Sequence, residues 1–376
     1  GGEWYIDEMK TRANEAAPVP FSLPKSKYTF VNDWLPVTDD IKRPVDIREV
    51  IDFVATDHPD SKRMLSNGEL TDFIPTRRIA LPVDKENAVA SGIVKEADRD
   101  LMVDTVYLNI NKSSLDKNEL MILDMLANFE WKRPIYLTQP YIFQALGLLD
   151  YLQFDGYAYR FVPILTPVDR RTLEIGRIDP DYTAPLLLGE GERGFRYGNL
   201  ADPRVYVDYF IQYNLGASRS RDAFARTAKE LLRRGETDRA VELLDAGLAK
   251  LPTSQIRFTE SNTYPYIEAY YAAGAMKAEG AIEKGDALMR EYIDNLIGYI
   301  EYYLQFEGVQ ADMVNDVMLD KYDMLWNLYH LAAYAGRTEI VAELNAYFRT
   351  LGASDAELYD VGDRTSADSL RPAPQP

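Results

Sequence analysis

The chain has 376 residues, of which 46% are hydrophobic and 27% charged, a composition typical of a globular protein. Its 42 basic and 60 acidic residues give a net charge of −18, which argues against binding to nucleic acid or anionic membrane surfaces. Cysteine is absent and histidine occurs only as His58 and His330, so disulfides are excluded and a zinc site is disfavoured. We expect no metal and no cofactor.

The order of patterns along the chain predicts two folded domains, because the length exceeds one ordinary hydrophobic core. The first half alternates strand and helix patterns, whereas the second half is helical throughout. We expect an α/β domain with a small, at least partly parallel sheet, followed by an all-α domain of tetratricopeptide-like helical repeats. The predicted parts are an extended arm (1–45), the α/β domain (46–165), a linker (166–204), the helical domain (205–360) and a disordered tail (361–376).

The predicted arm combines a short helical pattern, Trp4 to Ala17, with a series of prolines that favour an extended chain. Four aromatic residues are expected to anchor it: Phe21, Tyr28, Phe30 and Trp34. A helix follows, with Asp46 as its N-cap and Glu49 three residues later, as in a capping box. Its apolar residues recur at helical spacing, so one face is expected to be buried.

After this helix, predicted strands and helices alternate along the chain. Arg77–Val83 and Thr105–Ile110 are predicted strands, and Leu115–Phe129 is a predicted helix. A further strand, helix and strand are expected at Pro134–Gln139, Tyr141–Gln153 and Tyr157–Leu165. A helix of that length between two strands favours a parallel, right-handed crossover.

The predicted linker loses periodicity and contains Gly189-Glu190-Gly191, which lacks the context of a phosphate-binding loop. In the helical half, small residues and a proline occur at tetratricopeptide offsets within Thr227–Pro252: Gly235, Ala240, Leu244, Gly247 in place of the usual alanine, and Pro252. Later helices, with Gly274 and Gly336 expected at turns, do not keep a period of about 34 residues.

Two aromatic stripes are the main candidate binding residues. Tyr299 and Tyr303 share one helical face with Tyr292, and Tyr322, Trp326 and Tyr329 share another. Aromatic rings bury area while keeping a polar edge, so the stripes predict a groove for a glycan or an extended peptide. Packing between repeat helices is the alternative, and the more common use of such stripes.

Two charged features have similar alternatives. Arg160 falls on a strand face where a charge needs a carboxylate or a ligand, and a structural ion pair is the simpler use. Four aspartates share one helical face and repel each other unless a cation or a basic partner offsets them. They are Asp312, Asp316, Asp320 and Asp323. Placement in a loop or a first helical turn is the simpler explanation.

No catalytic pattern accompanies these features. Asp155 has no second carboxylate at a recognisable spacing, and no serine lies in a Gly-x-Ser-x-Gly motif. We therefore expect no catalytic residue in this chain.

Several segments resemble one known family. They are WYIDEMK (4–10), PVPFSLPKSKY (18–28), DIREVIDFVATDHP (46–59), LPVDKENAVASG (81–92), NINKSSLDKNELMILDMLANFEWKRPIYLT (109–138), GYAYRFVPI (156–164) and DPRVYVD (202–208). Together, over most of residues 3–252, they resemble the C-terminal extramembrane region of bacterial protein O-mannosyltransferase-like multi-pass membrane proteins, glycosyltransferase family 117. The stretch Arg196–Leu200 is shorter than the family pattern, and the later repeats are irregular.

The resemblance implies a parent protein with an N-terminal transmembrane module that uses a lipid-linked sugar donor and holds the catalytic acids. This chain is then expected to be a soluble accessory fragment at the periplasmic face of the inner membrane, recruiting or positioning acceptor protein or glycan. One alternative is a helical-repeat scaffold for envelope protein–protein interaction. The other is an enzyme acting on a glycan or sugar nucleotide, which predicts a pocket near Asp155 or Arg160 with carboxylates about 5–10 Å apart.

Overall fold

The structure, a computed structural model, describes residues 3–11, 17–29, 34–168, 174–213 and 217–359. The predicted anchor Phe30 and the predicted tail 361–376 lie outside this range. Two compact units divide the chain after Asp179, within the predicted linker: unit 1 is Gly1–Asp179 and unit 2 is Pro180–Pro376. Among the described residues, no helix has the length and apolarity required to cross a membrane.

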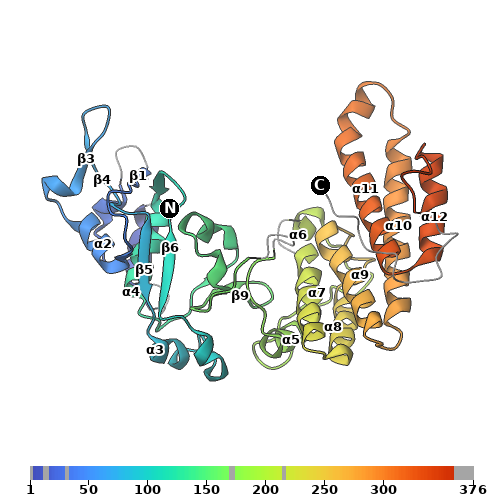
Figure 1. The fold of residues 1–376 in the computed structure, drawn as a ribbon, viewed down its shortest axis with the longest axis horizontal. Helices are drawn as coiled ribbons and strands as arrows, with labels where there is room; N and C mark the ends of the chain where they lie inside the picture. The colour runs from blue at the N-terminus through green and yellow to red at the C-terminus, as the bar shows by residue number, and fades with distance from the viewer. Residues whose placement is uncertain (1–2, 12–16, 30–33, 169–173, 214–216, 360–376) are drawn as a thin grey trace. The chain divides into compact units, whose positions relative to one another are not determined.

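Unit 1 is built around a three-stranded sheet of order β2-β5-β6 (Figure 1). The strands are β2 (Val45–Asp46), β5 (Arg78–Pro82) and β6 (Thr105–Asn109). β2 runs parallel to β5, and β6 runs antiparallel to it, so the prediction of a small, partly parallel sheet is confirmed. Val106 and Leu108 of β6 are buried while Tyr107 is exposed, as the alternation of the strand requires.

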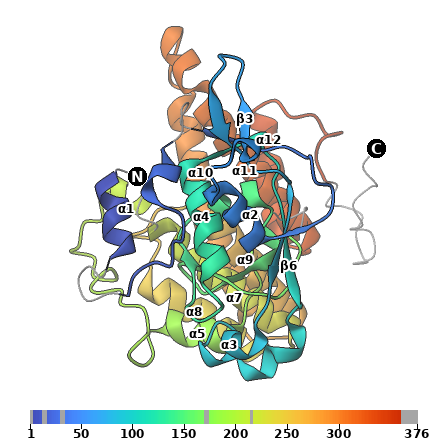
Figure 2. The same cartoon turned by 90° about the vertical axis from the view of Figure 1, so that its left-hand side faces the viewer.

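Three helices accompany this sheet: α2 (Ile47–Ala55), α3 (Lys85–Ala90) and α4 (Lys117–Asn128). Asp46 begins α2 as its N-cap, as predicted, but it accepts its 2.8 Å hydrogen bond from the backbone of Arg48 and not from Glu49, so the cap differs from the predicted capping box. Asp116 and Glu119 form a capping box at the start of α4. α2 and α4 lie side by side, which joins their apolar faces in one core (Figure 2).

Two short antiparallel strand pairs complete the first part of unit 1. β1 (Trp34–Pro36) pairs antiparallel with β7 (Ser114–Asp116), and β3 (Lys62–Met64) pairs antiparallel with β4 (Leu70–Asp72). The first pair brings the end of the arm next to the start of α4.

The segment after α4 differs from its prediction. β8 (Tyr136–Leu137), β9 (Leu152–Phe154) and β10 (Tyr159–Phe161) form a sheet in which β10 runs antiparallel to both others, so the predicted parallel crossover is wrong. The residues between β8 and β9 form short 3-10 turns instead of a helix. Gly147, with φ of 71°, interrupts them where an added Cβ would lie 2.9 Å from the carbonyl oxygen of Asn109.

The arm, with helix α1 (Glu3–Lys10), is held by a buried carboxylate of α4. Asp124 accepts hydrogen bonds from the backbone of Ser22 at 2.9 Å and of Leu23 at 3.0 Å, and from the hydroxyl of Tyr28. Burial, together with this hydrogen bond and the charge of Asp124, raises the pKa of the Tyr28 hydroxyl. Tyr28 therefore anchors the arm, as predicted.

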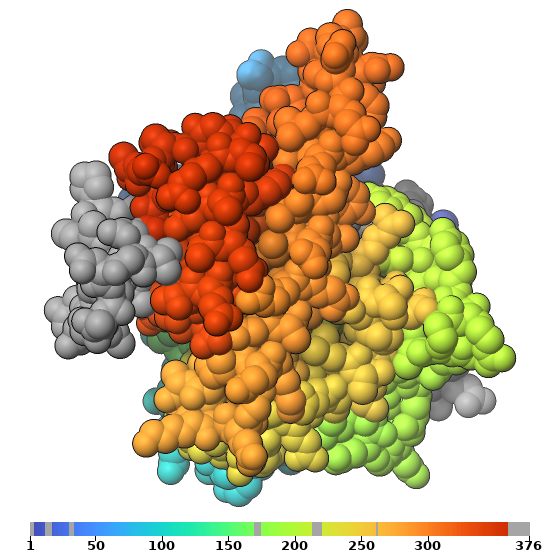
Figure 3. All heavy atoms as spheres, turned by 90° about the vertical axis from the view of Figure 1, so that its right-hand side faces the viewer, coloured from blue at the N-terminus to red at the C-terminus, as the bar shows by residue number. Residues whose placement is uncertain are grey.

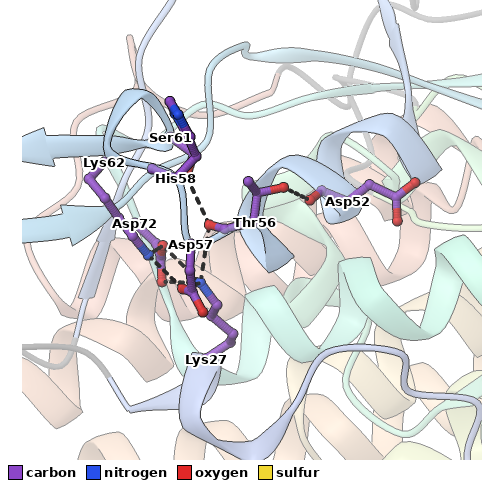
Figure 4. A network of polar contacts seen from close by, with 8 residues as sticks. All are labelled: Lys27, Asp52, Thr56, Asp57, His58, Ser61, Lys62 and Asp72. Atoms are coloured by element: carbon purple, nitrogen blue, oxygen red, sulfur yellow. Dashed lines mark hydrogen bonds and ion pairs between the residues drawn. The ribbon is translucent and has the colours of Figure 1, made fainter.

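A charged network fixes the same part of the arm to β3 and β4 (Figure 4). The ammonium of buried Lys27 lies 2.7 Å from Asp57 and 3.2 Å from Asp72. Lys62 pairs with the same two carboxylates; burial alone would lower the pKa of Lys62, but these contacts raise it. Two cations face two anions, so the network is internally compensated and we assign it a structural role.

Unit 2 is helical in its described part, as predicted (Figure 1). Its helices are α5 (Pro180–Leu188), α6 (Tyr209–Tyr213), α7 (Ala217–Arg233), α8 (Thr237–Lys250), α9 (Glu260–Ala275), α10 (Ala281–Tyr303), α11 (Val309–Tyr334) and α12 (Thr338–Thr350). α5 lies within the stretch that the sequence predicted as an irregular linker. The sequence did not predict this helix because it contains Pro180 and Pro185 and is followed by several glycines.

Glycines have two uses in unit 2. Gly336, with φ of 69°, lies at the turn between α11 and α12, as predicted. The prediction for Gly274 is wrong: it lies inside α9, where an added Cβ would overlap the side chain of Ile282. Gly247 is a similar close approach, because a Cβ there would overlap Phe224 and the hydroxyl of Tyr266.

Candidate functional site

An open cleft of about 720 Å³ lies in unit 1 where β2 and β5 end. Because these strands run parallel, Asp46 and Pro82 lie at the same edge of the sheet, next to the first residues of α2 and α3. Ligands of open α/β sheets bind at this edge, where strands end and helices begin. The topology therefore makes the cleft the leading candidate site.

The cleft has an apolar floor and a charged rim. The apolar lining comes from Ile47, Leu81, Pro82, Val83, Leu126, Ala127, Phe129 and Trp131. The polar lining comes from Asp46, Arg48, Asp84, Lys85, Glu86, Asn87, Asp104, Glu130 and Lys132. Five carboxylates against three cations leave the rim acidic, so an anionic ligand is disfavoured.

Two consecutive residues of this lining have left-handed backbone conformations. Glu130 has φ of 51° and Trp131 has φ of 55°, and neither is a glycine. This conformation costs about 1–2 kcal/mol per residue, so it persists only where surrounding contacts enforce it. Strained non-glycine residues concentrate at ligand sites, which makes this turn the most informative feature of the cleft.

The contacts of Trp131 explain how the strain is held. Its indole Nε1–H donates a 2.8 Å hydrogen bond to the carbonyl of Pro82, and its own carbonyl accepts one of 2.8 Å from the hydroxyl of Ser91. The ring stacks on Phe161 at 5.3 Å between centroids, and only 1% of the residue is exposed. The tryptophan is thus a fixed support under the cleft, and its neighbour Glu130 is directed to the rim.

The rim groups of the turn are tied to one another. The backbone carbonyl of Glu130 accepts a 3.1 Å hydrogen bond from the amide of Asn87, which also contacts Asp84 at 2.9 Å. The carboxylate of Glu130 pairs with Lys132 and, at 3.6 Å, with Arg48. Lys132, and secondarily Arg48, hold the pKa of the Glu130 carboxyl below its usual value. Glu130 is therefore ionised at neutral pH and available as a hydrogen-bond acceptor.

This arrangement favours binding over catalysis. Glu130 and Asp104 are both exposed at the rim, and Asp104 pairs with Lys85 at 2.6 Å. A general acid needs a carboxyl whose pKa is raised toward neutrality, and the pKa of Glu130 is shifted the other way. Carboxylate and amide groups above an apolar floor instead suit the hydroxyls and the apolar faces of a sugar.

Arg160, a predicted ligand residue, lies outside the cleft in β10. Its guanidinium Nε lies 3.0 Å from Asp155, and its Nη1 donates a 2.8 Å hydrogen bond to the carbonyl of Gly92. Burial raises the pKa of Asp155, and Arg160 opposes the shift. Asp179, whose charge also raises that pKa, pairs with Lys95 at 2.7 Å. Both carboxylates are almost fully buried, so their cluster has a structural ion pair rather than an open catalytic pocket.

The aromatic stripes form two clusters in unit 2. Tyr299 and Tyr303 stack at 6.2 Å and are partly exposed on α10. On α11, Tyr322 and Trp326 pack against Phe348 of α12, Trp326 in a 4.3 Å stack. Tyr329 is completely buried and donates its hydroxyl hydrogen bond to Asn345, so no ligand can reach it in this conformation. Glycan or peptide binding by the exposed rings stays a prediction.

The four aspartates of the acidic stripe all lie on α11 and are exposed. Asp312 lies in the first turn, whereas Asp316, Asp320 and Asp323 extend along the helix. Within the described ranges, no group of three or more His, Cys, Asp and Glu residues is arranged to hold a metal ion. Of the two histidines, His330 hydrogen-bonds Tyr359 at 2.9 Å and His58 caps a short turn.

The cleft was missed from the sequence. Its residues come from four separate segments, and left-handed conformations at Glu130 and Trp131 have no sequence signal because neither is glycine or asparagine. Two strands that are each followed directly by a helix N-cap, at Asp46 and Asp84, are the one pattern that could have located it, but only the cap at Asp46 and the strand at Arg77–Val83 were predicted.

The comparisons with known proteins concern the same unit. Residues 1–182, just under half of the chain, match the family model described as TMEM260-associated domain 2. This match contains every residue of the cleft. Comparisons with curated proteins and with solved structures gave no significant match.

Proposed function

We propose that unit 1 is an accessory domain of a TMEM260-like glycosyltransferase, and that its cleft binds a sugar of the acceptor glycoprotein. The family match supports the association, since TMEM260 is an O-mannosyltransferase-like family. The observation that carries the sugar-binding role is the enforced turn at Glu130 and Trp131 in the floor and rim of the cleft.

In this proposal the chain binds the acceptor, and another part of the parent enzyme catalyses the sugar transfer. The resemblance to glycosyltransferase family 117 assigns sugar transfer to a membrane-embedded module, and this chain retains the acceptor nearby. The sugar donor is a lipid-linked mannose and the acceptor is a protein hydroxyl. The chain acts on the extracytoplasmic side of the membrane, which in a bacterium is the periplasmic face of the inner membrane. The helical unit then acts as a tetratricopeptide-like platform for the polypeptide part of the acceptor.

Charge and shape fit an uncharged, hydroxyl-rich ligand. The acidic rim repels phosphate, which disfavours a sugar nucleotide or the lipid-linked donor itself in this cleft. Asn87 and Glu130 can hydrogen-bond vicinal hydroxyls, while the apolar floor receives the C–H face of the ring. Binding to one sugar through a few contacts is expected to be weak, in the millimolar range.

The experiment is saturation-transfer difference NMR on the full chain, with methyl α-mannoside and an O-mannosylated threonine peptide as probes. The proposal predicts transfer to the sugar protons of both probes, and free methyl α-mannoside should compete with the sugar of the peptide but not with an unmannosylated peptide bound to the helical unit. Glu130→Gln keeps the size of the side chain and removes its charge, and it should weaken binding about fivefold or more. Glu283→Gln, an exposed glutamate of α10, is the matched control and should leave binding unchanged. The absence of transfer to the sugar protons of both probes, or no effect of Glu130→Gln, would reject the sugar-binding role.

A further inference from the structure

The end of the α10–α11 hairpin is a second surface without an assigned role. It comprises residues 301–323, here called the tip, which include the last turn of α10 and the first half of α11. Every one of these residues is described by the structure, and none is buried. The buried residues of α11 begin only at Met324, where α12 covers the helix. In Figure 3 this end of the hairpin, in orange, projects beyond α12, in red.

The tip exposes large apolar side chains that its own unit does not cover. Val309 and Met313 are 75% and 78% exposed, and Val317 continues their line at intervals of four residues. Tyr302, Leu304 and Leu319 are also exposed. The opposite face of α11, with Ala311, Val314 and Met318, is partly buried. The outer apolar stripe is therefore additional to the residues that join the hairpin.

The acidic residues run beside this apolar stripe. On a helix of 3.6 residues per turn, Asp312, Asp316 and Asp320 form a row immediately next to Val309, Met313 and Val317. From position 291 to position 320 the sequence has seven acidic residues and no lysine, arginine or histidine: Glu291, Asp294, Glu301, Glu307, Asp312, Asp316 and Asp320. The four aspartates of the stripe have no ion pair among the described residues. The tip thus exposes apolar side chains and is strongly negative, with six carboxylates and one lysine, Lys321, in residues 301–323.

We propose that the tip binds a basic amphipathic segment of a partner protein. An apolar stripe next to a row of like charges matches a helix with apolar residues on one face and lysine or arginine beside them. The partner's cations would offset the repulsion among aspartates spaced four residues apart, which the free chain leaves uncompensated. This site is separate from the cleft, so the proposal does not depend on sugar binding.

Charge distinguishes this partner from other occupants of the tip. A second copy of the chain has a net charge of −18, and its own tip contains six acidic residues and one lysine, Lys321, so it would bring net negative charge against the aspartates. Residues 360–376 contain three acidic and two basic residues and so offer no net positive charge. An anionic bilayer surface would be repelled by the acidic row.

The test is fluorescence anisotropy of the full chain with a labelled amphipathic leucine–lysine peptide of about 14 residues, long enough for a stable helix on binding. A scrambled peptide of the same composition is the control for charge alone. We expect the amphipathic peptide to bind at least tenfold more tightly, because only it presents one apolar face. Binding should weaken as salt is raised.

Variants separate the two components of the surface. The triple change Val309→Ser, Met313→Ser and Val317→Ser should weaken binding about tenfold or more. The triple change Asp312→Asn, Asp316→Asn and Asp320→Asn should weaken it about threefold or more and flatten the salt dependence. The matched control neutralises three exposed carboxylates elsewhere in unit 2, Asp238→Asn, Glu242→Gln and Glu283→Gln, and should change affinity less than twofold. All these positions are unburied, so each variant should fold with the helical circular-dichroism spectrum of the parent, and the aspartate triple should melt at the same temperature or higher because it relieves repulsion.

Four results would overturn the proposal. They are equal binding of the scrambled peptide, an equal loss of affinity in the control triple, tip-dependent capture on neutral phosphatidylcholine vesicles, and a tip-dependent dimer in sedimentation. The first two would show nonspecific charge attraction, the third a membrane-binding tip, and the fourth an interface between copies.

Discussion

The indole Nε1–H of Trp131 donates a 2.8 Å hydrogen bond to the carbonyl oxygen of Pro82. This bond joins the last residue of β5 to the turn that follows α4, two segments 49 residues apart in the sequence. Because both residues line the cleft, the hydrogen bond fixes the distance between its two sides. The shape of the cleft is therefore set by the core beneath it.

Replacing this indole by a phenyl ring tests the link. Trp131→Phe keeps an aromatic ring against Phe161 but leaves the Pro82 carbonyl without its partner. We expect a loss of about 2–4 kcal/mol in the free energy of unfolding, from the lost hydrogen bond and the smaller ring. Urea denaturation measures it, and sugar binding should weaken in parallel. An unchanged midpoint would show that the indole does not hold the turn.

Glycine substitutions test the strain at the rim. Glu130→Gly removes the left-handed penalty and should raise the urea midpoint, yet it should weaken sugar binding about fivefold or more because the carboxylate is lost. Lys277→Gly is the matched control, since Lys277 has φ of 67° in unit 2, far in sequence from the cleft. It should stabilise the chain by about 1 kcal/mol and leave binding intact. A Glu130→Gly protein that binds sugar as tightly as the parent would contradict the role given to the carboxylate.

The buried pair of Arg160 and Asp155 predicts a pH-dependent effect. Burial already raises the pKa of Asp155, and removing the opposing cation in Arg160→Met raises it further. A group whose pKa is raised by folding loses stability as pH rises through that pKa. The deficit of the variant should therefore be small near pH 4 and grow to about 3–5 kcal/mol near pH 7.

Urea titrations at the two pH values check this prediction. The double variant Arg160→Met and Asp155→Asn is the control, because it removes both charges together, and its deficit should be nearly independent of pH. A pH-independent deficit in the single variant would mean that the ion pair is not what Arg160 contributes.

Helix packing in unit 2 predicts opposite outcomes for one substitution at two glycines. Gly247→Ala places a methyl group against Phe224 and Tyr266 and should destabilise the chain by about 1–3 kcal/mol. Gly298→Ala adds the same group in open space within α10 and should stabilise it by about 0.5–1 kcal/mol. Thermal melts of both variants measure the two changes in stability. If both substitutions stabilise the chain, or both destabilise it equally, the close packing at Gly247 is contradicted.

The sequence predicted the fold class because its strongest signals are local. Alternation in Thr105–Ile110 and helical spacing in Leu115–Phe129 each identify an element on their own, and β6 and α4 lie there. The prediction of a parallel crossover after α4 failed because Phe143 and Leu146 fit helical spacing. In the structure, Gly147 and its close approach to Asn109 favour short 3-10 turns instead. That choice depends on a residue distant in the sequence, so no local pattern contains it.

The candidate site was harder to predict than the fold, because its residues are brought together by contacts between segments distant in the sequence. The predicted site residues Arg160 and Tyr329 are both buried. Arg160 hydrogen-bonds the carbonyl of Gly92, 68 residues away in sequence, and Tyr329 hydrogen-bonds Asn345 of the next helix. No sequence pattern indicated Glu130 and Trp131, because residues other than glycine adopt left-handed conformations only when tertiary contacts enforce them. Spacing along a helix or strand shows which residues share a face, but not whether that face meets solvent or another element.

The most direct test of the account is photo-crosslinking of the full chain with a mannosyl-threonine peptide that has a diazirine on the sugar. Digestion and mass spectrometry then locate the label. We predict labels within the cleft segments, residues 46–48, 81–87, 104 and 126–132, that are competed by free methyl α-mannoside and strongly reduced in Glu130→Gln. Labels confined to the aromatic surface around Tyr299, Tyr303 and Trp326 would contradict the cleft as the sugar site.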